Sequence, residues 1–200
     1  MKNRLRALVV AGSATALLAA VAAAAPGPAA APAARPAAVR WAAAVLYAYA
    51  PDDDIRFTVD AKAAPFSRPL NLPGAEKGLP TDARGTVTVH HHSPATQTTG
   101  TSEAEVDCLV AGGRTATLTA VVKTSTVGRE GRRIGLAVQE GERGAPDRLG
   151  FSWDFFDLDV RPDGSAPEAT VGLRMAPAPF TTVVRGGFDV TPAPLPPIRP

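Results

Sequence analysis

Hydrophobic and polar positions alternate along short runs between residues 52 and 191, and Gly, Pro and Asp separate these runs. In the first run, Ile55, Phe57 and Val59 alternate with charged and hydroxyl side chains. Because successive side chains of a β-strand point to opposite faces, this period of two predicts strands with one buried face. About eight such strands are expected, in the runs 55–61, 86–92, 105–110, 115–122, 134–138, 149–155, 171–175 and 188–190.

The connections between these runs are typical of an antiparallel sheet. Gly112 and Gly113 lie between two alternating runs, which predicts a hairpin whose turn needs positive φ angles. The region lacks a sustained helical period, and prolines interrupt most candidate helices. We therefore expect an all-β domain, an antiparallel β-sandwich of about eight strands, with a β-barrel as the alternative.

The first 24 residues have the order of a secretory signal peptide. Lys2, Arg4 and Arg6 precede an uncharged apolar stretch, and Ala22 and Ala24 supply the small residues that a signal peptidase requires. We expect cleavage after Ala24 and a secreted, extracellular protein. The alternative is an uncleaved membrane anchor, because about 18 apolar residues can span a bilayer.

The rest of the chain divides into a linker, a domain and a tail. Residues 25–50 are rich in Ala and Pro and are expected to form a disordered linker. Within them, the apolar stretch 41–50 fits either a short helix or an added edge strand. The domain is expected to cover 51–191, and the prolines of 192–200 predict an extended, disordered tail.

Charge and cysteine content exclude several function classes. The formal net charge is +2, but the three basic residues of the first 24 carry this excess, so the remainder has a net charge of −1. That remainder lacks the basic surface that nucleic-acid binding requires, and we expect no membrane contact after cleavage. The single Cys excludes an intramolecular disulfide and a cysteine-built zinc site. We expect a monomer.

Three stretches resemble one group of proteins. They are EVDCLVAGGRTATLTAVV at 105–122, GRRIGLAV at 131–138 and PDRLGFSW at 146–153. Together they resemble uncharacterised secreted proteins of high-GC Gram-positive bacteria, in which a Cys-containing strand turns through Gly into a Thr/Ala/Val strand. The resemblance implies no known activity, cofactor or catalytic residue.

All three His residues stand together at the end of one predicted strand. His90 and His92 share a face, whereas His91 points toward the core side. Two imidazoles at positions i and i+2 can hold a divalent metal such as Zn²⁺ or Cu²⁺ when a carboxylate supplies a third ligand, for example Asp60 or Glu105. The opposing interpretation is that His90 and His92 are exposed strand-end residues.

Other candidate chemistry has a simpler structural interpretation. The acidic run 157–164 misses the spacing of a calcium loop, and Trp153 lies on the apolar register of its strand rather than forming a sugar-stacking platform. Cys108 lies on the apolar register with Val106 and Val110, which predicts a buried thiol with a raised pKa. A Cys/His nucleophilic pair would need the His triplet nearby.

The sequence contains no serine-hydrolase elbow, no zinc-protease motif and no nucleotide-binding loop. We therefore expect no catalytic residues and no resident cofactor, and the main hypothesis is a secreted non-catalytic module that binds an extracellular or cell-envelope partner or has a structural role there. One alternative is a secreted metal-dependent hydrolase that uses the His90/His92 face. Another is a carrier of small ligands, which needs a barrel with a cavity.

Overall fold

The computed structural model describes residues 35–152, 161–165, 171–172 and 174–197, of which Trp41 is described in its backbone alone. Within these ranges the regular elements are all β-strands. They are β1 (Ala38–Leu46), β2 (Asp54–Ala63), β3 (Ala83–Ser93), β4 (Thr98–Gly112), β5 (Thr115–Ser125), β6 (Arg133–Gln139), β7 (Arg148–Phe151), β8 (Thr181–Gly186) and β9 (Asp189–Thr191).

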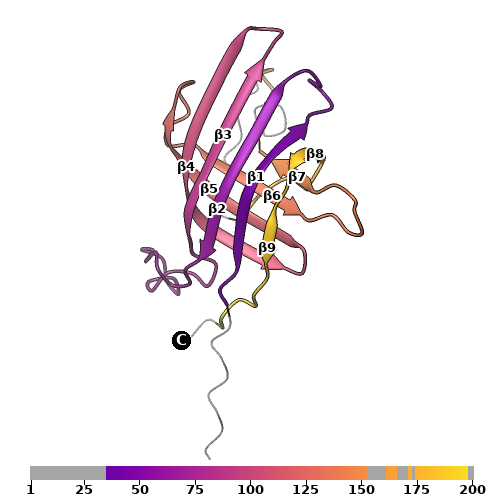
Figure 1. The fold of residues 1–200 in the computed structure, drawn as a ribbon. Helices are drawn as coiled ribbons and strands as arrows, with labels where there is room; N and C mark the ends of the chain where they lie inside the picture. The colour runs from indigo at the N-terminus through magenta and orange to yellow at the C-terminus, as the bar shows by residue number, and fades with distance from the viewer. Residues whose placement is uncertain (1–34, 153–160, 166–170, 173, 198–200) are drawn as a thin grey trace, which may run out of the picture. The chain divides into compact units, whose positions relative to one another are not determined.

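β1 closes the sheet into a barrel because it pairs on both sides. Its residues 38–45 pair with β2, and its residues 43–46 pair with β8 on the opposite edge. The strands from β2 to β8 follow one another as an antiparallel meander. β1 to β8 thus form a closed ring (Figure 1), and β9 continues the β8 edge by pairing with residues 38–40 of β1.

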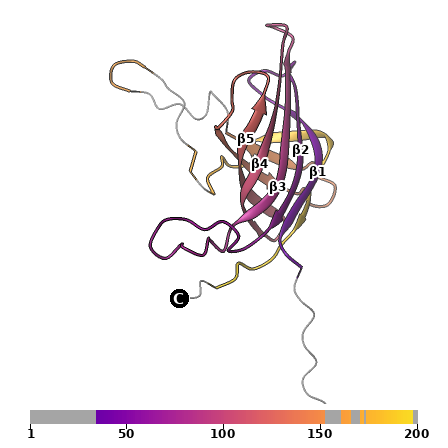
Figure 2. The ribbon, with the colours of Figure 1, turned by 90° about the vertical axis from the view of Figure 1, so that its left-hand side faces the viewer.

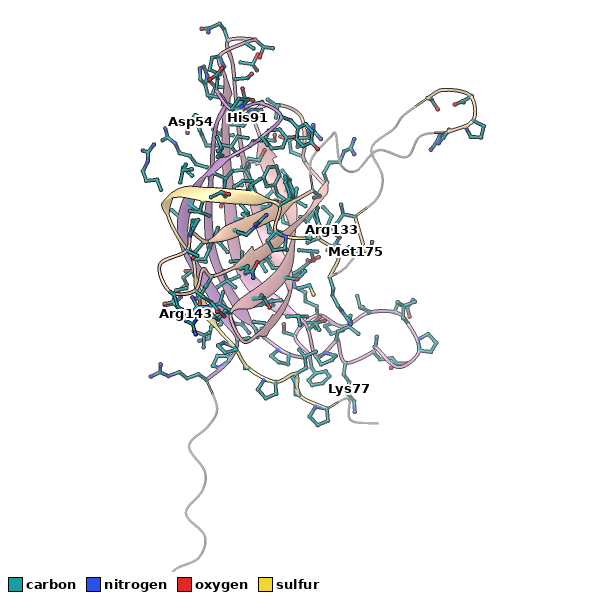
Figure 3. The ribbon with its side chains drawn as sticks, turned by 90° about the vertical axis from the view of Figure 1, so that its right-hand side faces the viewer. Asp54, Lys77, His91, Arg133, Arg143 and Met175 are labelled. Atoms are coloured by element: carbon teal, nitrogen blue, oxygen red, sulfur yellow. The ribbon has the colours of Figure 1, made fainter. Side chains whose placement is uncertain are left out.

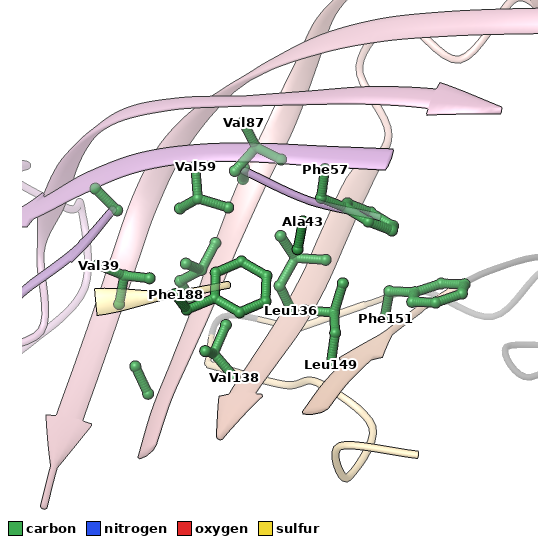
Figure 4. Packing of buried hydrophobic residues seen from close by; sticks show 14 of the residues in the cluster. Val39, Ala43, Phe57, Val59, Val87, Leu136, Val138, Leu149, Phe151 and Phe188 are labelled. Atoms are coloured by element: carbon green, nitrogen blue, oxygen red, sulfur yellow. The ribbon is translucent and has the colours of Figure 1, made fainter. Parts of the chain in front are cut away.

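Apolar side chains fill the interior of this ring. An eight-stranded barrel is just wide enough for the inward side chains to meet. Large side chains such as Phe57, Phe151 and Leu118 pack with small ones such as Ala61 and Ala120, all at most 2% exposed. Figure 4 shows part of this packing, with side chains from opposite walls of the barrel in one cluster.

A β-bulge in β4 reverses the alternation expected there. The register shifts at Asp107, which is the extra residue of the bulge. Beyond it Leu109 joins the core cluster, although strict alternation with Val106, Cys108 and Val110 inward would place Leu109 on the opposite face. Cys108 leaves that cluster and is buried beneath the loop 64–82 through a bridge to Asp82.

The loop 64–82 is held against the outside of β4 by Arg68 and Asp82. The Arg68 guanidinium donates to the carbonyl oxygen of Val106 at 2.8 Å and to the Glu105 carboxylate at 2.9 Å. The Asp82 carboxylate, which is buried, accepts from the backbone N–H groups of Arg68 and Leu79 at 2.8 and 3.0 Å. These bonds satisfy the buried polar groups of the loop and order it.

A second segment, 174–180, crosses the outside of β6 and β7. A Cβ atom at Gly135 would collide with the carbonyl oxygen of Met175, and one at Gly150 would collide with that of Ala178. Figure 3 labels Met175 of this segment and Arg133 of β6. The two glycines therefore permit a close backbone approach that larger residues would prevent.

Two carboxylates complete the seam between β7 and the β8–β9 edge, where β7 and β8 pair over two residues. Asp147 accepts from the backbone N–H groups of Gly141 and Phe188, both at 2.7 Å. Glu140 accepts from the N–H of Val190 at 2.5 Å. Side chains thus replace backbone acceptors where the ladder is interrupted.

The all-β prediction is confirmed, but the preferred β-sandwich is wrong, because the sheet closes on itself as the alternative barrel does. The stretch 41–50, left open between a helix and an edge strand, contributes to β1, which is paired on both sides. The domain therefore begins inside the expected linker 25–50 rather than at residue 51. The expected strand at 171–175 is wrong for its described residues, and β8 had not been predicted.

The expected signal peptide lies outside the described residues, as does most of the Ala/Pro stretch that follows it. Of the expected tail, residues 192–197 are described and contain no regular element. In the part of the chain that the structure describes, no helix is long and apolar enough to cross a membrane.

Candidate functional site

A polar cluster lies at one end of the barrel, where the β1–β2 turn meets the end of β3. One Asp53 carboxylate oxygen lies 2.6 Å from Nε2 of His91, and the other accepts a hydrogen bond from the Ser93 hydroxyl at 3.0 Å. The side chain of Asp53 is 10% exposed and that of His91 28%. The cluster is therefore largely shielded from water.

Strand register explains how these three residues meet. His91 and Ser93 continue the inward register of Val87 and Val89 past the end of the apolar core. The β1–β2 turn is closed by backbone hydrogen bonds, including one from Asp53 N–H to the carbonyl of Ala50 at 3.1 Å. The turn thus carries the carboxylate over the end of β3.

Aromatic side chains form the apolar base of this end. Tyr47 lies 5.9 Å from Phe151 and 6.4 Å from Phe180 between ring centroids. Burial raises the pKa of the Tyr47 phenol above its usual value, and the nearby Tyr49 and Asp53 raise it further. Tyr47 therefore stays neutral at physiological pH.

The order of the cluster does not match an activated serine. In a nucleophilic triad the imidazole accepts the hydroxyl proton and the carboxylate orients the imidazole. Here Asp53 lies between His91 and Ser93, and its carboxylate accepts a hydrogen bond from the Ser93 hydroxyl. This arrangement ties the β1–β2 turn to the β3–β4 hairpin rather than activating Ser93.

His90 and His92 lie on the outer face of the barrel, as the alternation predicts. His92 pairs with Asp54 across β2 and β3, and His90 pairs with Arg56. The Arg56 guanidinium binds both carboxylate oxygens of Asp54, with 2.8 Å between Nε and Oδ1. That hydrogen bond lowers the pKa of Asp54, which is therefore ionised at neutral pH.

The third ligands suggested from sequence lie elsewhere on the sheet. Asp60 and Glu105 both pair with Thr86, four and six residues before the two histidines on β3. Asp60 lies 3.5 Å from Arg40, and Glu105 is bound by Lys123 at 3.1 Å and by Arg68. Lys123 and Arg68 lower the pKa of Glu105 by hydrogen bonding.

The described side chains contain no group of three or more His, Cys, Asp and Glu residues placed to hold a metal ion. The metal site at His90 and His92 stays a prediction. Asp54 is a carboxylate that the register places opposite His92, and Arg56 binds it.

We predict that Zn²⁺ at about 100 times its Kd raises the unfolding free energy by about 2.7 kcal/mol, because a ligand that binds only the folded state stabilises it. The His90→Ala/His92→Ala variant should abolish this shift in thermal denaturation. Arg56→Ala should enlarge the shift at a limiting Zn²⁺ concentration, because it frees Asp54. A shift retained by the double variant would place the metal elsewhere.

Cys108 is buried, as predicted, but beneath the β2–β3 loop rather than inside the barrel. Desolvation raises the pKa of its thiol. His90 pairs with Thr101, seven residues from Cys108 along β4, which corresponds to roughly 20 Å. A Cys/His pair is therefore wrong.

The remaining sequence candidates lie partly outside the described residues, namely Trp153 and the first half of the acidic run 157–164. Of that run, Asp163 is described and accepts hydrogen bonds from the N–H and hydroxyl of Ser165 at 2.9 and 2.6 Å. These bonds lower the Asp163 pKa and are typical of a solvated turn.

An open polar groove lies on the outer face of β3, β4 and β5, the face turned toward the viewer in Figure 2. Sequence reasoning missed it, because its members come from three strands and the β5–β6 turn. Hydroxyl groups and three charged side chains dominate its lining: Thr88, Thr101, Ser102, Glu103, Lys123, Thr124, Ser125, Thr126 and Glu130.

These observations define the class of protein: a closed, eight-stranded antiparallel meander barrel with an apolar interior. Its clusters of polar side chains lie on the outer face and at one end. Comparisons with protein-family models, with curated proteins and with solved structures find no match.

Proposed function

We propose that this chain is exported and that its barrel acts outside the cytoplasm as a non-catalytic binding module, with a partner in the cell envelope or its surroundings. The observation that carries the proposal is the division between the inside and the outside of the barrel. Apolar side chains occupy the interior, whereas hydroxyl and carboxylate groups line an open groove on the outer face.

The two alternative functions have less support. A small-ligand carrier needs an internal cavity, but Phe57, Phe151 and Phe188 pack against the aliphatic side chains of the barrel core. A metal-dependent hydrolase needs a metal with an open coordination position, but Arg56 binds the Asp54 carboxylate that stands opposite His92. The N-terminal pattern of residues 1–24 supports export.

The proposal predicts saturable binding to envelope material. The full chain, expressed with its N-terminal segment and recovered from the culture medium, should co-sediment with the isolated cell envelope of the producing organism. Binding should persist at raised ionic strength, because the net charge of −1 after residue 24 leaves little long-range attraction to screen.

Serum albumin in the same buffer provides the control for trapping in the pellet. A chain that is retained in the cytoplasm contradicts the export half of the proposal. A chain that is exported but stays in the supernatant at every concentration contradicts the binding half.

A further inference from the structure

We propose that the outer groove binds a neutral saccharide chain. This inference rests on the proposed binding function and names its ligand class. Its centre is a cross-strand row of three residues, Thr88 on β3, Glu103 on β4 and Thr124 on β5. We call these three residues the groove row.

The barrel register places the groove row. Thr88 pairs with Glu103, and Glu103 pairs with Thr124, so the three stand side by side across neighbouring strands about 4.8 Å apart. A second bulge, between Val122 and Thr124, keeps Thr124 in line with Glu103. Both threonines are stiff at χ1, which restricts the directions of their two hydroxyl groups.

The hydrogen-bonding capacity of the groove row is unused within the described residues. Neither threonine hydroxyl nor the Glu103 carboxylate bonds another described group, so all three face solvent and can exchange water for a ligand. Lys123 differs, because its ammonium is bound to Glu105 at 3.1 Å.

Hydrogen bonds of the hydroxyl groups of Ser102, Ser125 and Thr126 and of the Glu130 carboxylate fix the wall of the groove. The Thr126 hydroxyl accepts from the N–H of Thr101 at 2.9 Å, and the Ser102 hydroxyl donates to that of Ser125 at 2.9 Å. Glu130 accepts from the N–H of Ser125 at 2.9 Å. The β5–β6 turn is thereby held beside the groove row.

A saccharide matches this chemistry better than other ligands. Each sugar hydroxyl both donates and accepts, as threonine does, and a carboxylate can accept from two neighbouring hydroxyls at once. The described residues of the lining include no aromatic side chain, so an apolar ligand would bury little favourable surface against them. Glu103 and Glu130 repel anions, and Lys123 of the lining is already paired with Glu105.

A cationic peptide is the competing ligand, because Glu103 would attract it. Glu103→Gln separates the two ligands, since the amide oxygen still accepts from hydroxyl groups but the charge is gone. Saccharide binding should change only a few-fold in this variant. Binding of a lysine peptide should fall much further, because it depends on the lost charge.

The probes are maltotetraose, the N-acetylglucosamine tetramer and tetralysine, each titrated into the exported protein and followed by NMR chemical shifts. We expect at least one saccharide to bind and the Thr88→Val/Thr124→Val variant to weaken it about tenfold. Two lost hydrogen bonds of about 0.7 kcal/mol each correspond to this factor. Thr58→Val is the matched control, because Thr58 pairs with Thr88 but lies outside the groove lining.

The proposal is overturned if neither saccharide binds, if the double variant binds as tightly as the parent, or if tetralysine binds the parent more tightly than either saccharide and is lost in Glu103→Gln. The Thr88→Val/Thr124→Val variant also separates this inference from the proposed function. Envelope binding that the double variant retains in full contradicts the groove inference alone. Absence of envelope binding by the parent chain contradicts the proposed function.

Discussion

Phe151→Ala is expected to lower the free energy of unfolding by about 3–5 kcal/mol, the range for truncating a fully buried phenylalanine. Phe151 is 1% exposed, and its ring centroid lies 5.1 Å from those of both Phe57 and Phe180. Truncation would leave a cavity under the barrel end and remove several aromatic contacts. Urea unfolding followed by circular dichroism measures the loss as a shift in the midpoint.

Tyr49→Ala provides the matched control for this experiment. Tyr49 belongs to the same aromatic group, with its ring 5.6 Å from that of Tyr47, but it is 77% exposed. Its removal should cost under about 1 kcal/mol. Equal losses for the two variants would mean that Phe151 does not pack in the barrel interior.

Arg133→Met is expected to destabilise the protein by about 3 kcal/mol, because it leaves a buried carboxylate without its cation. The bulge residue Asp107 is 6% exposed, and it accepts from the Thr119 hydroxyl at 2.6 Å and from the Arg133 guanidinium. Removing one partner of a buried ion pair costs about 3–5 kcal/mol. The lower end of that range applies because the Arg133 side chain is 26% exposed. Chemical unfolding at neutral pH measures the effect.

Two further variants separate charge burial from lost packing. Adding Asp107→Asn to Arg133→Met should recover part of the stability, because a neutral amide is less costly to bury than an unpaired charge. Arg40→Met removes an ion pair whose side chains are 61% and 70% exposed, and it should change stability by less than about 1 kcal/mol. No recovery by the added Asp107→Asn would contradict the electrostatic explanation.

Local alternation was sufficient to predict the strands that have one polar and one apolar face. β2 and β5 lie where the sequence placed them, with Phe57 and Leu118 inward. The Gly112–Gly113 hairpin is also confirmed, and Gly113 has a φ of 58°. The stretch that forms most of β1 was left open between a helix and an edge strand, because β1 is rich in Ala and Arg40 is its single charged residue, which is too weak an alternation to settle the choice.

The candidate sites were predicted in part. The inward direction of His91 and the outward direction of its two neighbours follow from strand period alone. The contact between His91 and Asp53 does not, because a turn brings the carboxylate across from another strand. The groove row likewise joins Thr88, Glu103 and Thr124 only through the registers of two hairpins.

By itself the sequence determined that the described domain is all-β and which face of most strands is buried, because both follow from the spacing of neighbouring side chains. The tertiary structure decided that the sheet closes, where the bulge turns Cys108 out of the core, and which polar groups meet. Backbone N–H and C=O groups are the same in every strand, so alternation says which face is buried but not which edges pair. Closure depends on β1 meeting β8, about 140 residues later in the chain, and only the folded chain brings those two edges together.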